Sequence, residues 1–176
     1  MTDYFALLDE ARRPWIDPEQ LKDKYFARNR VGAADAGLNE AFRVLSEPKL
    51  RLQHLLTLEG VPLSAGRPVP PQVAELFWNC GALLRDVDRW LSKNAEAGSA
   101  LARALLSGER AAIEKKLQEQ DRQLNATFEN ELRQLRDFDA ISPNDLDKLV
   151  EHYDSISYLT RLREQVTEKL HHLTIA

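Results

Sequence analysis

The sequence contains few of the residues on which disulfide, metal or covalent chemistry depends. Its 176 residues include a single cysteine, Cys80, which excludes an internal disulfide framework and a multi-cysteine metal site. No glycine-rich phosphate loop, Gly-x-Ser-x-Gly, His-Glu-x-x-His or Cys-x-x-Cys sequence occurs in it. These absences predict a protein that is not an enzyme and that holds no cofactor and no metal.

Long apolar runs and an excess of basic residues are missing as well. No run of about 18 apolar residues is available to cross a bilayer, and the N-terminus, MTDYFALLDE, is acidic and lacks a signal-peptide pattern. The formal net charge of −4 argues against a nucleic-acid partner, for which a basic surface is expected. Together with the single cysteine, these features predict a cytoplasmic protein with no nucleic acid and no membrane among its partners.

What is present is helical periodicity with well-marked breaks. Leu38, Phe42 and Leu45 recur at i, i+4 and i+7 and so share one helical face. Pro48 cannot continue that helix but can begin the next one, which Gly60 can end in a left-handed conformation. No alternating apolar stretch bounded by hairpin turns occurs, so no strand is expected. The pattern predicts an all-α protein.

An earlier helix has a defined start. Asp17 can act as its N-cap, Pro18 suits the first turn, and Gln20 lies where a capping-box residue would reach back. Leu21 and Tyr25 are four residues apart and are expected to pack against the neighbouring helices. This first region is therefore predicted to consist of short helices.

A proline-rich segment separates this region from a second one. Residues 61–72, VPLSAGRPVPPQ, contain four prolines and one glycine, so a linker is expected there. Longer helices follow. They comprise one over 72–91, an interruption at KNAEAGS, a short piece over 101–106, and a long helix beyond Gly108.

The last helix has the clearest predicted start. Ser142 is expected as its N-cap, Pro143 in its first turn, and Asp145 where negative charge suits a helix N-terminus. From there to the C-terminus the apolar residues keep near-heptad spacing, which suits a helix in an antiparallel bundle. The second region is therefore predicted to be an antiparallel three-helix bundle.

Four segments follow one another along the chain in a recognisable order: TDYFALL, IDPEQLKDKYF, LNEAFRVLSEPKLRLQHLLTLEG and SISYLTRLREQVTEKLHHL. Together they resemble the HscB type of J-domain co-chaperone, which serves iron–sulfur cluster assembly. The resemblance implies an L-shaped arrangement of a J-like domain (1–60), a proline-rich linker (61–72) and a C-terminal three-helix bundle (73–176). It also implies an adaptor that binds an iron–sulfur scaffold or other client protein through the bundle. The 93–110 region is longer than the family suggests.

One motif of the family is absent, which makes this a degenerate form. Family members carry His-Pro-Asp after the basic helix, where it contacts a DnaK-class chaperone and triggers ATP hydrolysis. Here residues 31–37 read VGAADAG, Asp35 alone cannot replace the triad, and none of the four histidines precedes a proline. Stimulation of a chaperone ATPase is therefore expected to be absent or weak, and the sequence leaves open whether a DnaK-class chaperone is a partner.

The resemblance also carries over a binding site by position. The family uses an apolar pair, four residues apart, on the first bundle helix and an aromatic residue of the last helix. These positions fall on Val73, Phe77 and Tyr158. A shift of the helix alignment by one residue would place Trp78 in the position of Phe77. Plain packing of the same side chains inside the bundle is the other interpretation. The glutamates that the family places beside the pair are absent here.

The basic helix of the first region has two interpretations. In the family this helix supplies the electrostatic part of the contact with the chaperone. The chaperone-facing residues would be Lys22, Lys24, Arg28 and Arg30. The alternative is a solvated helix face, which the interspersed acidic residues favour.

The remaining chemically versatile side chains indicate structure. Cys80 lies within an apolar stripe and is expected to behave as a small buried hydrophobe. His171 and His172 are adjacent on a helix and so point about 100° apart, which does not make a metal site. His54 is expected on the flank of its helix, without a functional role.

Two hypotheses of function remain. The first is a co-chaperone-like protein-binding adaptor. The second is a structural or regulatory helical protein that retains the fold without the co-chaperone function. Binding to the scaffold protein from the same genome distinguishes them.

Overall fold

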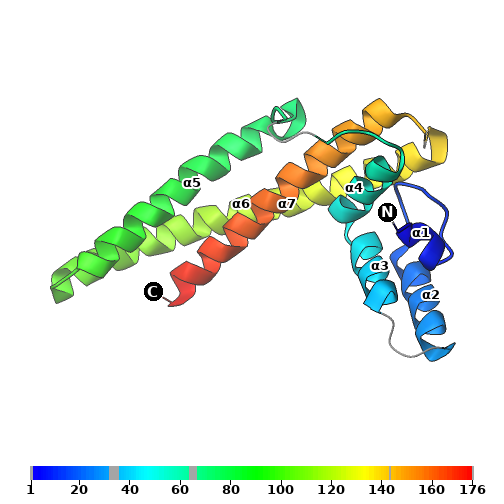
Figure 1. The fold of residues 1–176 in the computed structure, drawn as a ribbon. Helices are drawn as coiled ribbons and strands as arrows, with labels where there is room; N and C mark the ends of the chain where they lie inside the picture. The colour runs from blue at the N-terminus through cyan, green and yellow to red at the C-terminus, as the bar shows by residue number, and fades with distance from the viewer. Residues whose placement is uncertain (1, 32–35, 64–66, 143, 176) are drawn as a thin grey trace. The chain divides into compact units, whose positions relative to one another are not determined.

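The computed structural model describes residues 2–31, 36–63, 67–142 and 144–175, which form seven helices and no strand (Figure 1). The helices are α1 (Tyr4–Leu7), α2 (Pro18–Val31), α3 (Ala36–Ser46), α4 (Pro48–Leu58), α5 (Pro71–Glu96), α6 (Ala100–Ile141) and α7 (Leu146–Ile175). The predicted all-α class is confirmed. Residues 32–35, where the His-Pro-Asp loop would lie in the family, are outside the described residues and include Asp35.

The chain packs as two compact units that do not follow its linear order. One unit contains Met1–Pro68 and Glu131–Ile156, and the other contains Val69–Asn130 and Ser157–Ala176. Both α6 and α7 are therefore shared, because their adjoining ends belong to the first unit and the rest of each helix to the second. The first division along the chain falls inside the predicted linker, whereas the domain boundaries at residues 60 and 73 stay a prediction.

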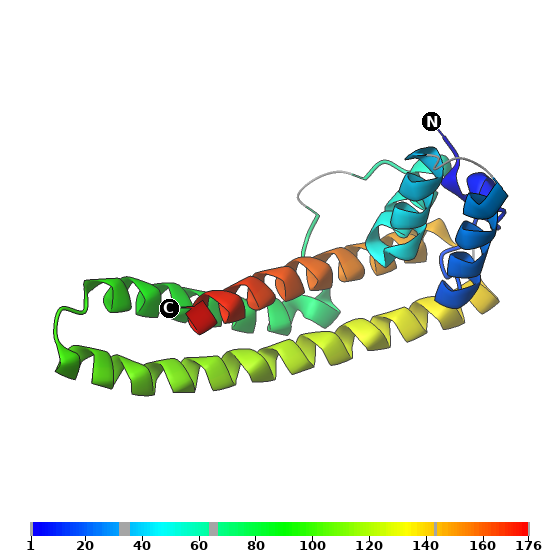
Figure 2. The ribbon, with the colours of Figure 1, turned by 90° about the horizontal axis from the view of Figure 1, so that it is seen from below.

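The second unit is a bundle of α5 with the longer parts of α6 and α7. Within it α6 runs antiparallel to α5 and to α7 (Figure 2). Lys169 Nζ of α7 lies 2.5 Å from Asp88 Oδ1 of α5, and Arg163 Nε of α7 donates to Asn125 Oδ1 of α6 at 2.7 Å. The buried residues of α5 are Val73, Cys80, Val87 and Trp90. The first three repeat every seven residues and Trp90 follows Val87 by three, so all four lie on one stripe of the helix in the core. The predicted antiparallel three-helix bundle is confirmed.

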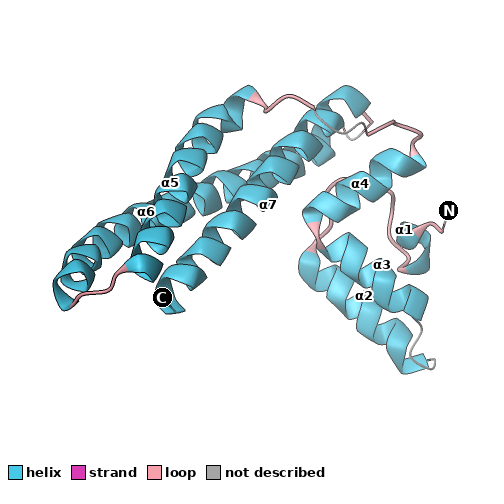
Figure 3. Ribbon diagram, turned by 60° about the vertical axis from the view of Figure 1, so that its left-hand side comes forward, coloured by secondary structure: helices cyan, strands magenta, loops and turns pink. Residues whose placement is uncertain are grey.

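In the first unit, α3 and α4 meet at Pro48, as the sequence predicts (Figure 3). Pro48 is the first residue of α4, and Glu47 before it has extended backbone, because a residue that precedes proline avoids the helical region. Gly60 follows α4 with a φ of 74°, a left-handed conformation in which a side chain would be strained. Both predicted breaks are confirmed.

The start of α2 is also where the sequence predicts it. Asp17 Oδ1 accepts hydrogen bonds from the backbone N–H groups of Glu19, at 2.9 Å, and Gln20, at 3.1 Å. Further along the helix, the ring of Tyr25 stacks on that of Phe42 in α3, with centroids 4.3 Å apart. The N-cap fixes where α2 begins, and this aromatic pair fixes how it packs.

The adjoining ends of α6 and α7 are held in the first unit by charged groups. Arg13, ahead of α2, forms an ion pair with Asp139 of α6, whose side chain is buried. The hydrogen bond to Asp139 raises the pKa of Arg13 above its usual value. Arg67 Nε donates to Asp154 Oδ2 of α7 at 2.7 Å. Loss of Arg13 would leave a buried carboxylate without its partner, which is strongly destabilising.

The predicted start of the last helix is wrong. The backbone N–H of Ser142 donates to the carbonyl of Phe138 at 2.8 Å, so Ser142 closes α6 and does not cap α7. The cap is Asp145, whose Oδ1 accepts from the N–H of Lys148 at 3.2 Å just before α7 begins. Pro143 is outside the described residues. Two residues with capping oxygens lie three positions apart here, and the sequence pattern does not choose between them.

The predicted break at Gly108 is also wrong, because α6 is one helix from Ala100 to Ile141. A Cβ at Gly108 would meet nothing within 4 Å, so this glycine lies on an open face of the helix. Glycine costs an exposed helix only about 1 kcal/mol relative to alanine. Packing offsets that cost, since Trp90 of α5 donates from Nε1 to the carbonyl of Leu106 at 2.8 Å.

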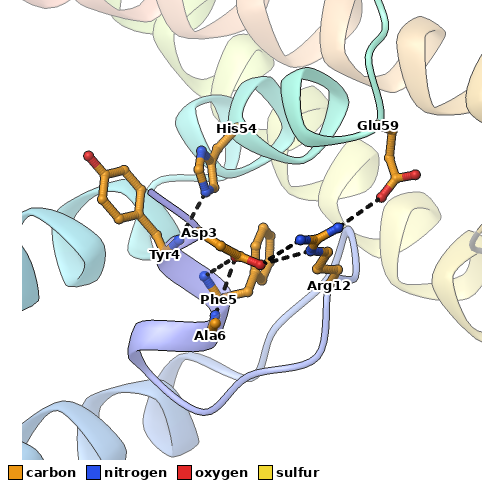
Figure 4. Close-up of polar contacts among 7 residues, drawn as sticks. All are labelled: Asp3, Tyr4, Phe5, Ala6, Arg12, His54 and Glu59. Atoms are coloured by element: carbon orange, nitrogen blue, oxygen red, sulfur yellow. Dashed lines mark hydrogen bonds and ion pairs between the residues drawn. The ribbon is translucent and has the colours of Figure 1, made fainter. Parts of the chain in front are cut away.

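A polar cluster fastens α1 to α4 in the first unit (Figure 4). Asp3 caps α1 by accepting from the N–H groups of its first turn, and Arg12 Nε donates to Asp3 Oδ2 at 2.9 Å. The N–H of Tyr4 donates to Nε2 of His54 at 3.1 Å, and the Phe5 ring stacks on the imidazole. The expectation that His54 lies on a helix flank is wrong, because its side chain is buried beneath α1.

We expect the free energy of unfolding to fall as the pH is lowered through about 6.5, the ordinary pKa of histidine. Burial lowers the pKa of His54, an effect that Asp3 opposes and Arg12 reinforces. Between the lowered pKa and the ordinary one the unfolded chain therefore binds more protons than the folded chain, so acid favours unfolding. A protonated Nε2 also cannot accept the N–H of Tyr4.

Urea denaturation between about pH 5 and pH 8 measures this dependence. In His54→Gln the amide oxygen can accept the same hydrogen bond at every pH, so the variant should lose less stability in acid than the parent chain. The same loss in both proteins would contradict the role assigned to His54.

Candidate protein-binding groove

A groove of about 380 Å³ lies between α5 and α7 in the second unit, and we call it the α5–α7 groove. Its lining residues are Phe77, Gly81 and Leu84 of α5 and Tyr158, Arg161, Leu162 and Gln165 of α7. The rings of Phe77 and Tyr158 meet edge to face with centroids 6.1 Å apart, which is a favoured geometry for aromatic pairs. The groove therefore offers an apolar floor, with polar groups supplied by α7.

Helical periodicity places these side chains together. The four lining residues of α7 are spaced at i, i+3, i+4 and i+7, and the three of α5 at i, i+4 and i+7, so each set shares one helical face. Gly81 keeps the groove open, because it carries no side chain and a Cβ there would meet only Arg85 Nη1, at 3.5 Å. The groove therefore lies between the facing sides of α5 and α7, at the position where Gly81 has no side chain to fill the space.

The structure separates the four residues predicted to bind a partner. Phe77 and Tyr158 lie in the groove, and both are partly exposed. Trp78 lies on the outer face of α5 with 71% of its surface exposed, and its ring is in edge contact with Phe77. Val73 is fully buried in the core, so its side chain presents nothing to a partner in this conformation. The binding role of these residues stays a prediction.

Sequence reasoning missed the other residues of the groove. Arg161, Leu162 and Gln165 could have been found from Tyr158, because they follow it at the spacing of one helical face. Gly81 gave no signal, since a glycine inside a helical pattern says nothing about which neighbour it faces. Exposure of Trp78 beside a less exposed Phe77 follows from their adjacent positions on the helix.

The predicted chaperone-facing helix is only partly available to a partner. Lys22 forms an ion pair within α2 at 3.7 Å, and Lys24 Nζ lies 2.9 Å from Glu10 Oε1. Arg28 and Arg30 are exposed and form no ion pair with any residue that the structure describes. Both lie in the last turn of α2, next to the undescribed segment. The role of these four residues toward a chaperone stays a prediction.

The other chemically versatile groups are used structurally. Cys80 is fully buried in the core of the second unit, and burial raises the pKa of its thiol to about 11, which keeps it protonated. His152 lies in the first unit, with Nδ1 2.7 Å from Glu131 Oε1. Over the described ranges, no three metal-ligating side chains gather into a possible ion site, and no helix has the length and apolarity to span a membrane.

Comparison by sequence finds no matching family model and no matching curated protein. Comparison by structure does find similar proteins. The chain superimposes on chaperone HscB from Vibrio cholerae with a TM-score of 0.60 and 17% identity, over 98% of this chain and 99% of the other. It has an HscB-type fold. A human co-chaperone HscB structure is matched with a TM-score of 0.46 and 19% identity, over 96% of this chain and 82% of that one.

The HscB-type fold accounts for the order of the elements. Short helices come first, and the bundle follows, with α5 as its first helix. At 17% identity the similarity establishes this architecture and not the partners, because one fold can present different surface residues. The function has to be argued from the surface of this chain.

Proposed function

We propose that this protein is a co-chaperone-like adaptor that binds another protein through the α5–α7 groove. Its partner would be an iron–sulfur scaffold or another client protein, and it would act in the cytoplasm by binding and not by catalysis. The single observation that carries the proposal is a groove with an aromatic floor in a bundle of the HscB-type fold, in which the floor residue Phe77 is in edge contact with the exposed ring of Trp78.

Physical chemistry supports this use of the groove. Tryptophan and tyrosine are enriched among the energetic anchors of protein interfaces, and here Trp78 is exposed and Tyr158 is partly exposed. The exposed ring of Trp78 has an apolar surface, and covering it with a partner would stabilise the complex by removing that surface from water. The groove volume suits one or two large side chains of a partner, which is how such anchors usually pair.

Substitution of Trp78 tests the proposal directly. In calorimetric titrations with the iron–sulfur scaffold protein from the same genome, Trp78→Ala should weaken binding by about tenfold or more. Leu105→Ala is the matched control, because Leu105 has 68% of its surface exposed but lies on α6 outside the groove. Equal affinity of the parent chain and Trp78→Ala, or no binding at all, would favour a structural or regulatory protein that retains only the fold.

We also expect no stimulation, or weak stimulation, of the ATPase of a DnaK-class chaperone. The chain has no His-Pro-Asp sequence, and charged residues on α2 alone can attract a chaperone without triggering hydrolysis. Steady-state phosphate release by the chaperone, with and without an excess of this protein, measures the effect. A rate increase of tenfold or more would contradict the prediction, and its loss in Arg28→Glu would then assign the effect to α2.

A further inference from the structure

The α5–α7 groove carries positive charge that no ion pair within the described ranges neutralises. Arg161 lines the groove, and Arg85 Nη1 lies close to Gly81, the residue that keeps the groove open. Both arginines are exposed, and neither forms an ion pair or hydrogen bond with any residue in the described part of the chain. The lining includes no aspartate and no glutamate.

The carboxylates that are close to the two arginines in the sequence form no ion pair with either of them among the described residues. On α5, Asp86 pairs with Arg89 at 3.0 Å, and Asp88 pairs with Lys169 at 2.5 Å. On α7, Glu164 follows Arg161 by one turn but makes no ion pair with it among the described residues. The two guanidinium groups therefore remain open to a negative group from outside, in a chain whose net charge is −4.

We propose that the α5–α7 groove selects an acidic segment of its partner, in which a large apolar side chain enters the groove and carboxylates beside it pair with Arg85 and Arg161. Guanidinium groups bind carboxylates through two parallel hydrogen bonds, which fixes the orientation of the segment as well as its charge. A basic segment would meet two unpaired like charges and be rejected. This inference rests on the proposed function and adds the chemistry of the bound segment.

Selection of phage-displayed random peptides of about 12 residues on the full chain tests the inference. The enriched peptides should combine an aromatic residue or leucine with aspartate or glutamate. The best peptide, labelled and followed by fluorescence anisotropy, should bind about tenfold more weakly, or worse, to the double variant Arg85→Glu, Arg161→Glu. It should also weaken several-fold when salt is raised from about 0.05 M to about 0.5 M.

The double variant Lys115→Glu, Lys116→Glu is the matched control, because it makes the same change of charge at two exposed positions of α6 in the same unit. Its affinity should stay within about twofold of the parent chain. Circular dichroism of each variant checks that the helices are retained.

The outcomes separate the two proposals. Enriched peptides that are basic or uncharged, and that lose binding in Tyr158→Ala, would overturn the charge preference and leave the groove as a binding site. The proposed function and this inference would both be contradicted by two results together: peptide binding that does not depend on Tyr158, and no binding of the scaffold protein.

Discussion

Replacing Arg51 by methionine should lower the free energy of unfolding by about 3 kcal/mol. Arg51 lies in α4 with 4% of its surface exposed, and it serves two backbone carbonyls that belong to other segments. Nε donates to the carbonyl of Pro14 at 2.9 Å, and Nη1 donates to the carbonyl of Leu45 at 2.7 Å. One side chain therefore ties the loop ahead of α2 and the last turn of α3 to α4.

Two effects of opposite sign decide the size of this change. Burial lowers the pKa of Arg51 to about 10, which shows that keeping its charge away from water is costly, and methionine removes that cost. Methionine cannot donate, however, so two buried carbonyls lose their partners, at about 1–3 kcal/mol each. The loss of these two hydrogen bonds should outweigh the removal of the buried charge, so the variant should be less stable. The guanidinium group satisfies both carbonyls, and an apolar side chain satisfies neither.

Arg43→Met is the control for Arg51→Met. Arg43 lies on α3 and is exposed, and its ion pair is with Glu40 in the same helix, at 2.7 Å. Its removal should cost no more than about 0.5 kcal/mol. Urea denaturation of the three proteins measures the difference. A loss below about 1 kcal/mol in Arg51→Met would contradict the role of Arg51 as a tie between segments.

The substitution Trp90→Ala should have an effect of similar or larger size, about 4 kcal/mol. Trp90 is the last buried residue of α5, with 3% of its surface exposed, and its Nε1 donates to the carbonyl of Leu106. It fills the space between α5 and the N-terminal part of α6. The cavity left by alanine would destabilise this end of the bundle. The 93–110 region, which is longer than the family resemblance suggests, lies at this end.

Two variants separate packing from hydrogen bonding at this site. Trp90→Phe keeps most of the apolar volume but removes the donor, so it should cost about 1–2 kcal/mol. Trp78→Ala removes the same side chain from an exposed position and should change stability by less than about 0.5 kcal/mol. Equal losses in Trp90→Ala and Trp78→Ala would contradict the assignment of Trp90 to the core.

The sequence predicted the elements that depend on local chemistry. The cap at Asp17, the break at Pro48 and the end at Gly60 are each set by one residue and its neighbours, so their positions could be read directly. Gly108 and Ser142 do not act as their local sequence predicts, because tertiary packing keeps α6 continuous at the first and a competing cap begins α7 after the second. The sharing of α6 and α7 between two units could not be seen, because a periodic apolar pattern does not show which neighbour each turn meets.

The candidate site could be predicted only in part. Phe77 and Tyr158 followed from resemblance and do lie in the α5–α7 groove, whereas Val73 follows the same pattern and is buried. The rotation of each helix about its axis decides which members of an apolar stripe remain at the surface, and sequence spacing fixes that rotation to no better than a residue. Arg161 carries no signal in the sequence, because a charged residue on a helix is ordinary and only the structure shows that it pairs with no described residue.

Photo-cross-linking from position 78 tests most directly whether partners bind at the α5–α7 groove. A photoreactive phenylalanine analogue would replace Trp78 in one variant and Leu105 in another, and each would be irradiated with the iron–sulfur scaffold protein. The account predicts a covalent adduct from position 78 and none from position 105. No adduct from position 78, or equal adducts from both positions, would contradict it.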